Sequence, residues 1–488
     1  MQLTDSTLLK VDALIAGRWY GAQQRFAVHD PATGAQLAMV SNVDSADAEA
    51  AIAAANKAWG PWQRLGAKQR ANLLRRWYDL LVQHQDDLAR IMTAEQGKPL
   101  AEARGEVAYG ASFVEWFAEQ AKRVNGETLP SFDNDRRQLV LRQSIGVCAA
   151  ITPWNFPLAM ITRKVAPALA AGCPVIIKPA ELTPLTALAA AELAMRAGIP
   201  AGVISVLTAD AERSVLVGKA LCDSPTVRHL SFTGSTEVGR ILMAQCAPTV
   251  KKLSLELGGN APFVVFDDAD IDSAVEGAYA SKFRNAGQTC VCTNRIYVQE
   301  AVYDTFVERF AARVRRAKLG NGFEPGVDLG PLIEPAAVAK VERHVQDALA
   351  HGARVVTGGH RVEGLGSDNF YAATVLADAG ADMLCAREET FGPLAPIFRF
   401  STEAEVIDAA NATESGLASY FYSRDIGRII RVAEALEYGM VGVNVGLMSG
   451  EHVPFGGVKQ SGLGREGSTH GIDEYVELKY LCLGDIQA

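Results

Sequence analysis

The chain has 488 residues, of which 49% are hydrophobic and 21% charged, the balance of an ordinary globular protein. This length predicts two or three domains around a substantial buried core. The formal net charge of −9, from 47 basic and 56 acidic residues, argues against nucleic acid as a main partner, because phosphate backbones attract basic surfaces.

Targeting and membrane signals are not evident in the sequence. Residues 1–17 lack the basic segment and long apolar run of a signal peptide. The most apolar region, 145–171, contains three prolines, an arginine and a lysine, so no membrane span is predicted. The eight cysteines are scattered, which predicts free thiols in a reducing compartment and a cytoplasmic protein. Cys290 and Cys292 have no second Cys or His pair nearby, so no metal site is expected.

Helical periodicity dominates the region 46–123, which Gly97-Lys98-Pro99 divides. From Val147 onward, short apolar strands alternate with helices. Pro157 suits the first turn of a helix that runs to about Ala171, and Thr183 suits the N-cap of the next helix. This alternation predicts βαβ units and a parallel sheet, with strands at 147–151, 175–178, 203–207, 227–232 and 252–257.

A second alternating block follows, with predicted strands at 263–266 and 295–299 and helices at 271–283 and 302–318, and it continues to about Val445. The strand-like segments 138–143 and 475–483 fit neither block. They pair either with a neighbouring subunit, which would make an oligomer, or as an edge hairpin within one subunit.

Polar residues gather where the strands of the first block end. Ligands of parallel sheets bind beyond the carboxyl ends of the strands, so these residues are expected at a ligand site. They are Thr152–Asn155, Lys178–Glu181, Thr233–Ser235 and Glu256–Gly259.

Three residues are candidates for catalysis, each with a structural alternative: for Glu256 an exposed carboxylate that caps the next loop, and for Asn155 a turn-forming residue. Cys290 ends the Gly-containing loop 285–290, although a single cysteine is more often a small buried hydrophobe. Glu256 ends an apolar strand, where burial would raise its pKa towards that of a general base. Asn155 lies between a strand and a helix, and its amide can donate to an oxyanion.

Two further segments suit a dinucleotide. Lys178 and Glu181 have side chains that suit the two hydroxyls of a ribose, although a surface ion pair is the alternative. The segment 234–239 joins a strand to a helix and can offer backbone N–H groups to a phosphate, but it is not the G-x-G-x-x-G fingerprint.

With the run 388–393, Glu-Glu-Thr-Phe-Gly-Pro, these motifs resemble the aldehyde dehydrogenase family over nearly the whole chain. The resemblance implies an α/β fold: a Rossmann-type parallel-sheet cofactor domain, an α/β catalytic domain and a small β oligomerisation segment. The expected boundaries are 1–125 with 145–255, then 256–445, and 126–144 with 470–488.

The resemblance also implies roles for single residues. Cys290 is the expected nucleophile, Glu256 the general base for Cys290 or the hydrolytic water, and Asn155 with the Cys290 N–H the oxyanion hole. Lys178 and Glu389 are similar to the pair that binds ribose. The full expected cofactor set is Thr152, Trp154, Asn155, Lys178, Ala180, Glu181, Gly234, Ser235, Val238, Leu257, Glu389 and Phe391, with Phe391 near the nicotinamide.

The cofactor is expected to be NAD, because Glu181 should repel the 2′-phosphate of NADP; NADP remains the alternative. Some relatives also form a reversible Cys–Cys bond at the position of Cys290 and Cys292.

A narrower resemblance is to succinate-semialdehyde and glutarate-semialdehyde dehydrogenases. It rests on the segments 161–164, 283–292 and 454–471. In that group Arg163, Arg284 and Ser449 would hold the distal carboxylate of a small semialdehyde, which suits guanidinium chemistry. The alternatives are a broad aldehyde dehydrogenase whose arginines are structural, and a CoA-acylating enzyme. Similar relatives predict a homo-oligomer, either a dimer or a tetramer.

Overall fold

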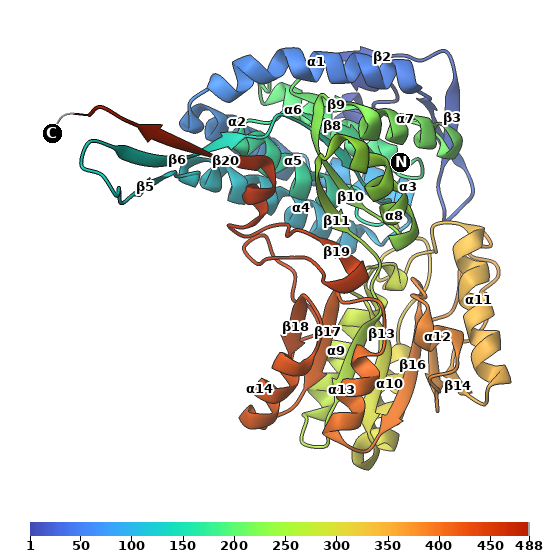
Figure 1. Ribbon diagram of the computed structural model, residues 1–488. Helices are drawn as coiled ribbons and strands as arrows, with labels where there is room; N and C mark the ends of the chain where they lie inside the picture. The colour runs from blue at the N-terminus through green and yellow to red at the C-terminus, as the bar shows by residue number, and fades with distance from the viewer. Residues whose placement is uncertain (487–488) are drawn as a thin grey trace.

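The computed structural model describes residues 1–486, and its first sheet has eight strands (Figure 1). Its centre is five parallel strands in the order β11-β10-β7-β8-β9, which confirms the predicted βαβ block. Their near-continuous apolar sequences suit a sheet that is covered on both faces. The bounds are β7 (Val147–Ile151), β8 (Val175–Lys178), β9 (Ile204–Val206), β10 (Val227–Thr233) and β11 (Lys252–Glu256).

Three strands at the edges of this sheet were not predicted. β1 (Ala13–Ile15) pairs antiparallel with β9 and with β2 (Arg18–Tyr20), and β19 (Gly462–Leu463) pairs antiparallel with β11. Strands of two or three residues are too short to show a periodicity of two, so local pattern could not reveal them.

Helices cover both faces of the first sheet. Successive residues of β7 alternate between two cores: Cys148 and Ala150 pack against α2 to α6, and Val147 and Ala149 against α1, α7 and α8. The helices are α1 (Ser45–Arg64), α2 (Ala67–Gln83), α3 (Gln85–Gln96), α4 (Leu100–Gln120), α5 (Ala159–Ala171), α6 (Pro184–Arg196), α7 (Ala211–Asp223) and α8 (Thr236–Cys246).

Two helix starts differ from expectation. α5 begins at Ala159, so Pro157 lies before the helix rather than in its first turn. Thr183 does occupy the N-cap of α6, but its side chain makes no capping hydrogen bond. The buried Glu95 of α3 instead accepts from the N–H groups of Leu185 and Thr186, at 2.7 and 2.8 Å. A capping group from another helix replaces the local one.

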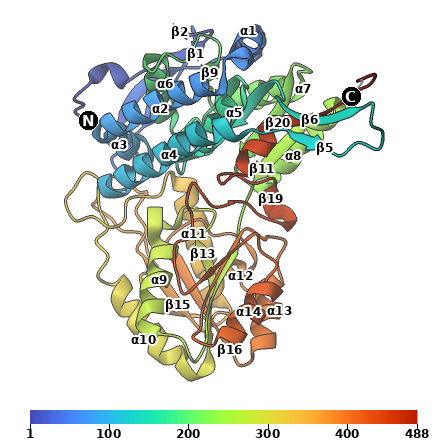
Figure 2. The same cartoon turned by 90° about the vertical axis from the view of Figure 1, so that its left-hand side faces the viewer.

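The second sheet has seven strands in the order β14-β15-β16-β13-β12-β17-β18, all parallel except β14. It forms a second domain below the first in Figures 1 and 2. Its strands are β12 (Ala261–Val265), β13 (Thr293–Gln299), β14 (Arg354–Thr357), β15 (Thr374–Ala377), β16 (Leu394–Phe400), β17 (Ala418–Tyr422) and β18 (Met440–Val443). Its helices are α9 (Ile271–Phe283), α10 (Tyr303–Val314), α11 (Pro335–Ala350), α12 (Leu384–Arg387), α13 (Glu403–Asn411) and α14 (Ile426–Ala435).

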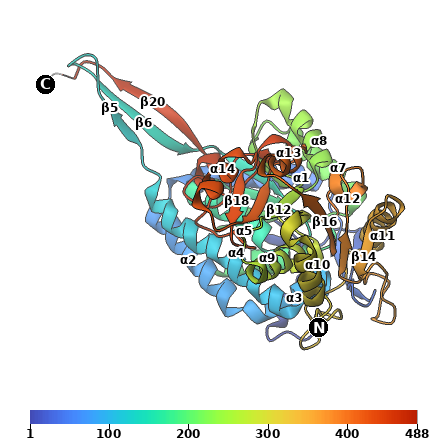
Figure 3. The same ribbon diagram turned by 90° about the horizontal axis from the view of Figure 1, so that it is seen from below.

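A three-stranded sheet projects from the side of the first domain (Figures 1 and 3). It contains β5 (Glu127–Leu129), β6 (Arg137–Ser144) and β20 (Val476–Leu483), and β6 pairs antiparallel with β20 along its whole length. The two segments that fitted neither block therefore pair with each other within one chain. A separate hairpin joins β3 (Arg25–His29) to β4 (Gln36–Ser41). Within residues 1–486, no helix has the length and apolar character needed to cross a membrane.

Candidate active site

A cavity of about 460 Å³ lies between the two domains. Loops that follow β7, β10 and β11 line one side, and α11 and the segment after α12 line another. Eight of the residues singled out from the sequence meet there, although they come from segments far apart in the chain. They are Trp154, Asn155, Gly234, Ser235, Leu257, Cys290, Glu389 and Phe391.

The other expected cofactor residues lie along the same carboxyl edge of the first sheet but outside the cavity. Thr152 follows β7, and its N–H donates to the carbonyl of Lys178 at 3.1 Å. Lys178 ends β8, and its Nζ lies 3.6 Å from the Glu181 carboxylate. Ala180 lies between them in the same turn, and Val238 lies in the first turn of α8.

The loop before Cys290 has a strained backbone. Asn285, Ala286 and Gly287 have φ values of 53°, 55° and 77°, three consecutive residues in the left-handed region. A Cβ on Gly287 would lie 2.2 Å from the carbonyl oxygen of Gly392, so only glycine fits there. Such conformations persist only where surrounding contacts impose them, and they concentrate at functional sites.

The Cys290 thiol is half-buried at the end of this loop. Burial raises its pKa to about 12, and the positive charge of Arg163 opposes that shift. The sulfur is therefore a thiol at neutral pH and needs a base to become a nucleophile. A Cβ on Gly259 would lie 2.2 Å from the Cys290 carbonyl oxygen, so only glycine fits at this position, three residues after Glu256.

Glu256, at the end of β11, is only 2% exposed. Within residues 1–486, neither of its carboxylate oxygens has a hydrogen-bond partner. Burial raises its pKa well above the ordinary value, and the nearby Glu466 carboxylate adds to the effect. A buried carboxyl group with free oxygens and a raised pKa has the properties of a general base.

Asn155 lies directly beside the nucleophile loop. Its Nδ2 donates to the carbonyl oxygen of Gln288 at 3.0 Å, two residues before Cys290. An amide nitrogen has two hydrogens, so one remains to donate to another acceptor. The side chain is 4% exposed and therefore well shielded from water.

The structure separates the two arginines that the sequence grouped. Arg163 is fully buried, and its Nε donates to Glu466 at 2.7 Å. Lys164 donates to the other oxygen of Glu466 at 2.5 Å. Arg284 is half-buried, with its guanidinium 4.8 Å from the centre of the Phe156 ring, and makes no ion pair with a carboxylate in residues 1–486.

Glu466 lies in the segment 454–471 that carries the narrower resemblance, but it was not singled out, because it is 303 residues from Arg163 and no local pattern pairs the two. Ser449 is half-buried in the loop after β18. None of Arg163, Arg284 and Ser449 lines the cavity that contains Cys290, so the expected substrate residues lie outside it.

Residues of both domains give the cavity a lining that suits a dinucleotide. Ser235 caps α8 by accepting from the Val238 N–H at 3.3 Å, and a helix N-terminus favours phosphate. One Glu389 oxygen accepts from the Gly259 N–H at 3.0 Å, which leaves the other for a ribose hydroxyl. Burial raises the pKa of Glu389 to about 7. Phe391 packs edge-to-face on Trp154 at 5.6 Å.

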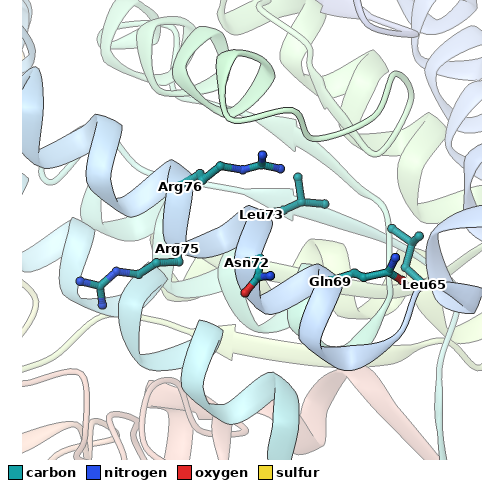
Figure 4. Close-up of a pocket in the computed structure, with 6 residues that line it drawn as sticks. All are labelled: Leu65, Gln69, Asn72, Leu73, Arg75 and Arg76. Carbon is teal, nitrogen blue, oxygen red and sulfur yellow. The ribbon is translucent and has the colours of Figure 1, made fainter.

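A second hollow, of about 600 Å³, lies along α2 (Figure 4). Its lining residues come from α2 and the turn before it, and they contain no cysteine, histidine or carboxylate. Arg75 there donates to Glu115 at 2.5 Å. The hollow therefore lacks the groups for the chemistry that the Cys290 cavity supports.

Comparisons with known proteins show what the chain is similar to. The model of the aldehyde dehydrogenase family matches residues 19–481. The chain is 60% identical to a 3-sulfolactaldehyde dehydrogenase of Pseudomonas putida, with 100% of this chain and 99% of that protein covered. It is 59% identical to a glutarate-semialdehyde dehydrogenase of Pseudomonas aeruginosa, with 100% of each chain covered.

An NADP(+) succinate-semialdehyde dehydrogenase of Escherichia coli is also 59% identical, with 99% of this chain and 100% of that protein covered. The crystal structure of a succinate-semialdehyde dehydrogenase from Burkholderia pseudomallei is 60% identical and superposes with a TM-score of 0.97 over 99% of this chain and 100% of that one.

The chain belongs to the aldehyde dehydrogenase family. It is an NAD(P)-dependent aldehyde dehydrogenase that acts on a small-molecule substrate. The predicted fold class and the family resemblance are both confirmed.

Proposed function

We propose that the protein oxidises a short aldehyde with a distal anionic group, succinate or glutarate semialdehyde, to the dicarboxylate. The observation that carries this proposal is the Arg284 guanidinium, which stands six residues before Cys290 without a carboxylate partner in residues 1–486. The nearby Glu102 carboxyl acts on this guanidinium only through space and accepts from the Asn285 N–H, so an anionic substrate would supply the direct partner that Arg284 lacks. The aldehydes in the three relatives' names all carry an acidic group on a short chain.

The proposed reaction begins when Glu256, directly or through water, takes the proton of the Cys290 thiol. The sulfur attacks the aldehyde carbon to give a thiohemiacetal, whose oxyanion receives hydrogen bonds from the Asn155 amide and the Cys290 N–H. A bound NAD(P) would supply the acceptor for the hydride of this carbon. After Glu256 has passed the thiol proton to solvent, it takes a proton from water; the hydroxyl attacks the thioester carbon, the C–S bond breaks, and the acid leaves as the sulfur regains a proton. In a CoA-acylating enzyme, CoA would take the place of this water.

Arg284 is expected to set the preference for anionic aldehydes. Arg284→Ala should lower kcat/KM for succinate semialdehyde roughly 10- to 100-fold, because a charged hydrogen bond contributes about 1.5–3 kcal/mol. The efficiency with butanal, which has the same length without the carboxylate, should change little. The measurement is NAD(P) reduction with both aldehydes, and with glutarate semialdehyde and 3-sulfolactaldehyde for chain length and anion type.

Arg163 provides the contrast. Its carboxylate partner is Glu466, which it shares with Lys164, so Arg163→Ala should mainly lower the stability, by about 3 kcal/mol, because it removes one member of a buried ionic cluster while Glu466 keeps Lys164 as a partner. If the wild-type enzyme oxidised butanal and the semialdehyde with equal efficiency, the carboxylate-binding role would be wrong and the broad-specificity alternative would replace it.

Glu181 is proposed to favour NAD over NADP. Its carboxylate lies beside Lys178 at the end of β8, where it can accept from the 2′-hydroxyl of the adenosine ribose and repel a 2′-phosphate. Glu181→Ser should therefore raise the relative kcat/KM with NADP. A higher kcat/KM of the wild-type enzyme with NADP than with NAD would mean that the Glu181 carboxylate turns away from the 2′-phosphate. One of the relatives is named as an NADP(+) enzyme.

We further propose that the projecting sheet of β5, β6 and β20 mediates assembly into a dimer or tetramer in the cytoplasm. Leu478 and Tyr480 on β20 are 67% and 57% exposed, and a partner subunit would cover them. The domain boundaries proposed are those expected from the sequence.

Cys292 is proposed as a redox partner of Cys290. Both are free thiols, and Lys282 donates to the Cys292 sulfur at 3.3 Å. Peroxide should inactivate the enzyme, a reducing agent should restore it, and Cys292→Ala should remove the reversible component. Equal recovery in the variant would contradict this role.

A further inference from the structure

A buried ion pair lies directly behind the Asn155 segment. Lys98 follows α3 and Glu106 belongs to α4, on the side of the first domain that faces the second (Figure 2). Their charged atoms are 2.5 Å apart, and both side chains are 1% exposed. In the sequence, Lys98 stood out only as part of a helix break. A buried pair of this kind contributes little net stability compared with a packed apolar pair, so another role has to be sought for it.

The ion pair holds both ends of one short segment. Lys98 Nζ donates to the Asn155 carbonyl oxygen at 2.8 Å and lies 4.0 Å from the centre of the Phe156 ring. The second Glu106 oxygen accepts from the N–H groups of Leu158 and Ala159, at 3.0 and 3.3 Å. The backbone from Asn155 to Ala159 is therefore anchored at both of its ends to the same two charges.

The same carbonyl also connects to the nucleophile loop. Asn285 Nδ2 donates to the Asn155 carbonyl oxygen at 3.0 Å, and the Gln288 carbonyl accepts from both asparagine side chains. Glu102, one turn before Glu106 on α4, accepts from the Asn285 N–H at 3.0 Å. The Asn155 segment and the strained loop before Cys290 are thus attached to one surface, the end of α3 and the first turns of α4.

We propose that Lys98 is a positioning residue, which with Glu106 fixes the Asn155 amide relative to Cys290. This inference rests on the oxyanion role proposed for Asn155. An oxyanion donor works only when it is preorganised, and a displacement of about 1 Å can cost roughly 100-fold in rate. Without Lys98, the Asn155 carbonyl loses one of its two side-chain donors and the segment can rotate away from the sulfur.

The first test is the double variant Lys98→Met with Glu106→Gln, which removes both charges together. We expect kcat to fall roughly 10- to 100-fold for both succinate semialdehyde and butanal, because the oxyanion forms with every aldehyde. KM for each aldehyde and the Kd of NADH, measured by its fluorescence, should change little. The same double substitution in an Asn155→Ala background should cause almost no further loss of kcat, because the Asn155 amide that the ion pair positions is already absent.

Two further variants keep the test decisive if the double variant does not fold. Glu106→Gln alone retains the Lys98 hydrogen bond to Asn155 and should lower kcat by a smaller factor, again only when Asn155 is present. Glu95→Gln is the matched control, since Glu95 is also a buried carboxyl group that caps a helix but does not contact the Asn155 segment. It should lower the stability and leave kcat per active site unchanged.

A loss of kcat that is equally large in the Asn155→Ala background would overturn the inference, as would full kcat in a folded variant without the ion pair. Failure of the substrate proposal can be distinguished from failure of this inference, because it would appear in the wild-type enzyme as equal kcat/KM for succinate semialdehyde and butanal. Wild-type activity of Asn155→Ala itself would remove the oxyanion role and the positioning role together.

Discussion

Cys290→Ala is expected to lower kcat by roughly 10⁴-fold or more, as removal of a covalent nucleophile does in other enzymes. Without the sulfur no thiohemiacetal forms, so the aldehyde carbon has no tetrahedral state from which hydride can leave. Glu256 and Asn155 would remain in place, but the bond between sulfur and the aldehyde carbon, whose formation they assist, could no longer form. The measurement is steady-state NAD(P) reduction together with the amount of NADH released in the first turnover.

The controls for Cys290 separate chemistry from folding. NAD(P) binding should persist in Cys290→Ala, because no cofactor residue is changed. Cys292→Ala should retain catalysis, since its sulfur is buried and bonded to Lys282 rather than directed into the cavity. Residual activity of Cys290→Ala above a few per cent, or complete loss of activity in Cys292→Ala, would contradict the assignment of Cys290 as the nucleophile.

Glu256→Gln is expected to lower kcat roughly 10²- to 10⁴-fold, the range for general base catalysis. Burial raises the pKa of Glu256 well above its usual value, so the group carries a proton at low pH and becomes a base as the pH rises. Activity of the wild-type enzyme should therefore increase with pH above the range in which an ordinary glutamate titrates, and this increase should be absent in the variant. A parallel pH profile in wild type and variant would contradict the role.

The first turnover shows which proton Glu256 removes. If Glu256 mainly activates water, the Glu256→Gln variant should release one equivalent of NADH at a near-normal rate, and the reaction should then stop at the thioester. If it mainly activates Cys290, the burst itself should slow, because burial keeps that pKa at about 12 and the sulfur protonated. Asn155→Ala is the comparison variant, since it should slow the burst without changing the pH profile.

Much of the fold was predictable because its signals are local. The parallel strands β7 to β11 appear as short apolar runs, and β7 to β10 are each followed by a helix with its own periodicity. Polar residues at their carboxyl ends marked the ligand edge, and residues of three of these four segments line one cavity. The bounds of the predicted strands differ from the observed ones by only one or two residues.

Other features depend on pairing between distant segments, which no local pattern encodes. The strands β1, β2 and β19 are too short to show a period. The β6 and β20 segments were recognisable as strands. Pairing within one chain and pairing with a neighbouring subunit would satisfy their backbone hydrogen bonds equally well, so the sequence did not choose between them. Thr183 has the sequence of a cap, yet the cap is Glu95, which lies about 90 residues away.

The sequence by itself determined the family, and through that resemblance it predicted the roles now proposed for Cys290, Glu256 and Asn155. Only the tertiary structure decided how those groups are supported. Glu466 pairs with both Arg163 and Lys164, Arg284 makes no ion pair in residues 1–486, and Lys98 reaches Asn155 across 57 residues. The physical reason is that charge compensation depends on distance in space, and a buried charge finds its partner only when the chain has folded.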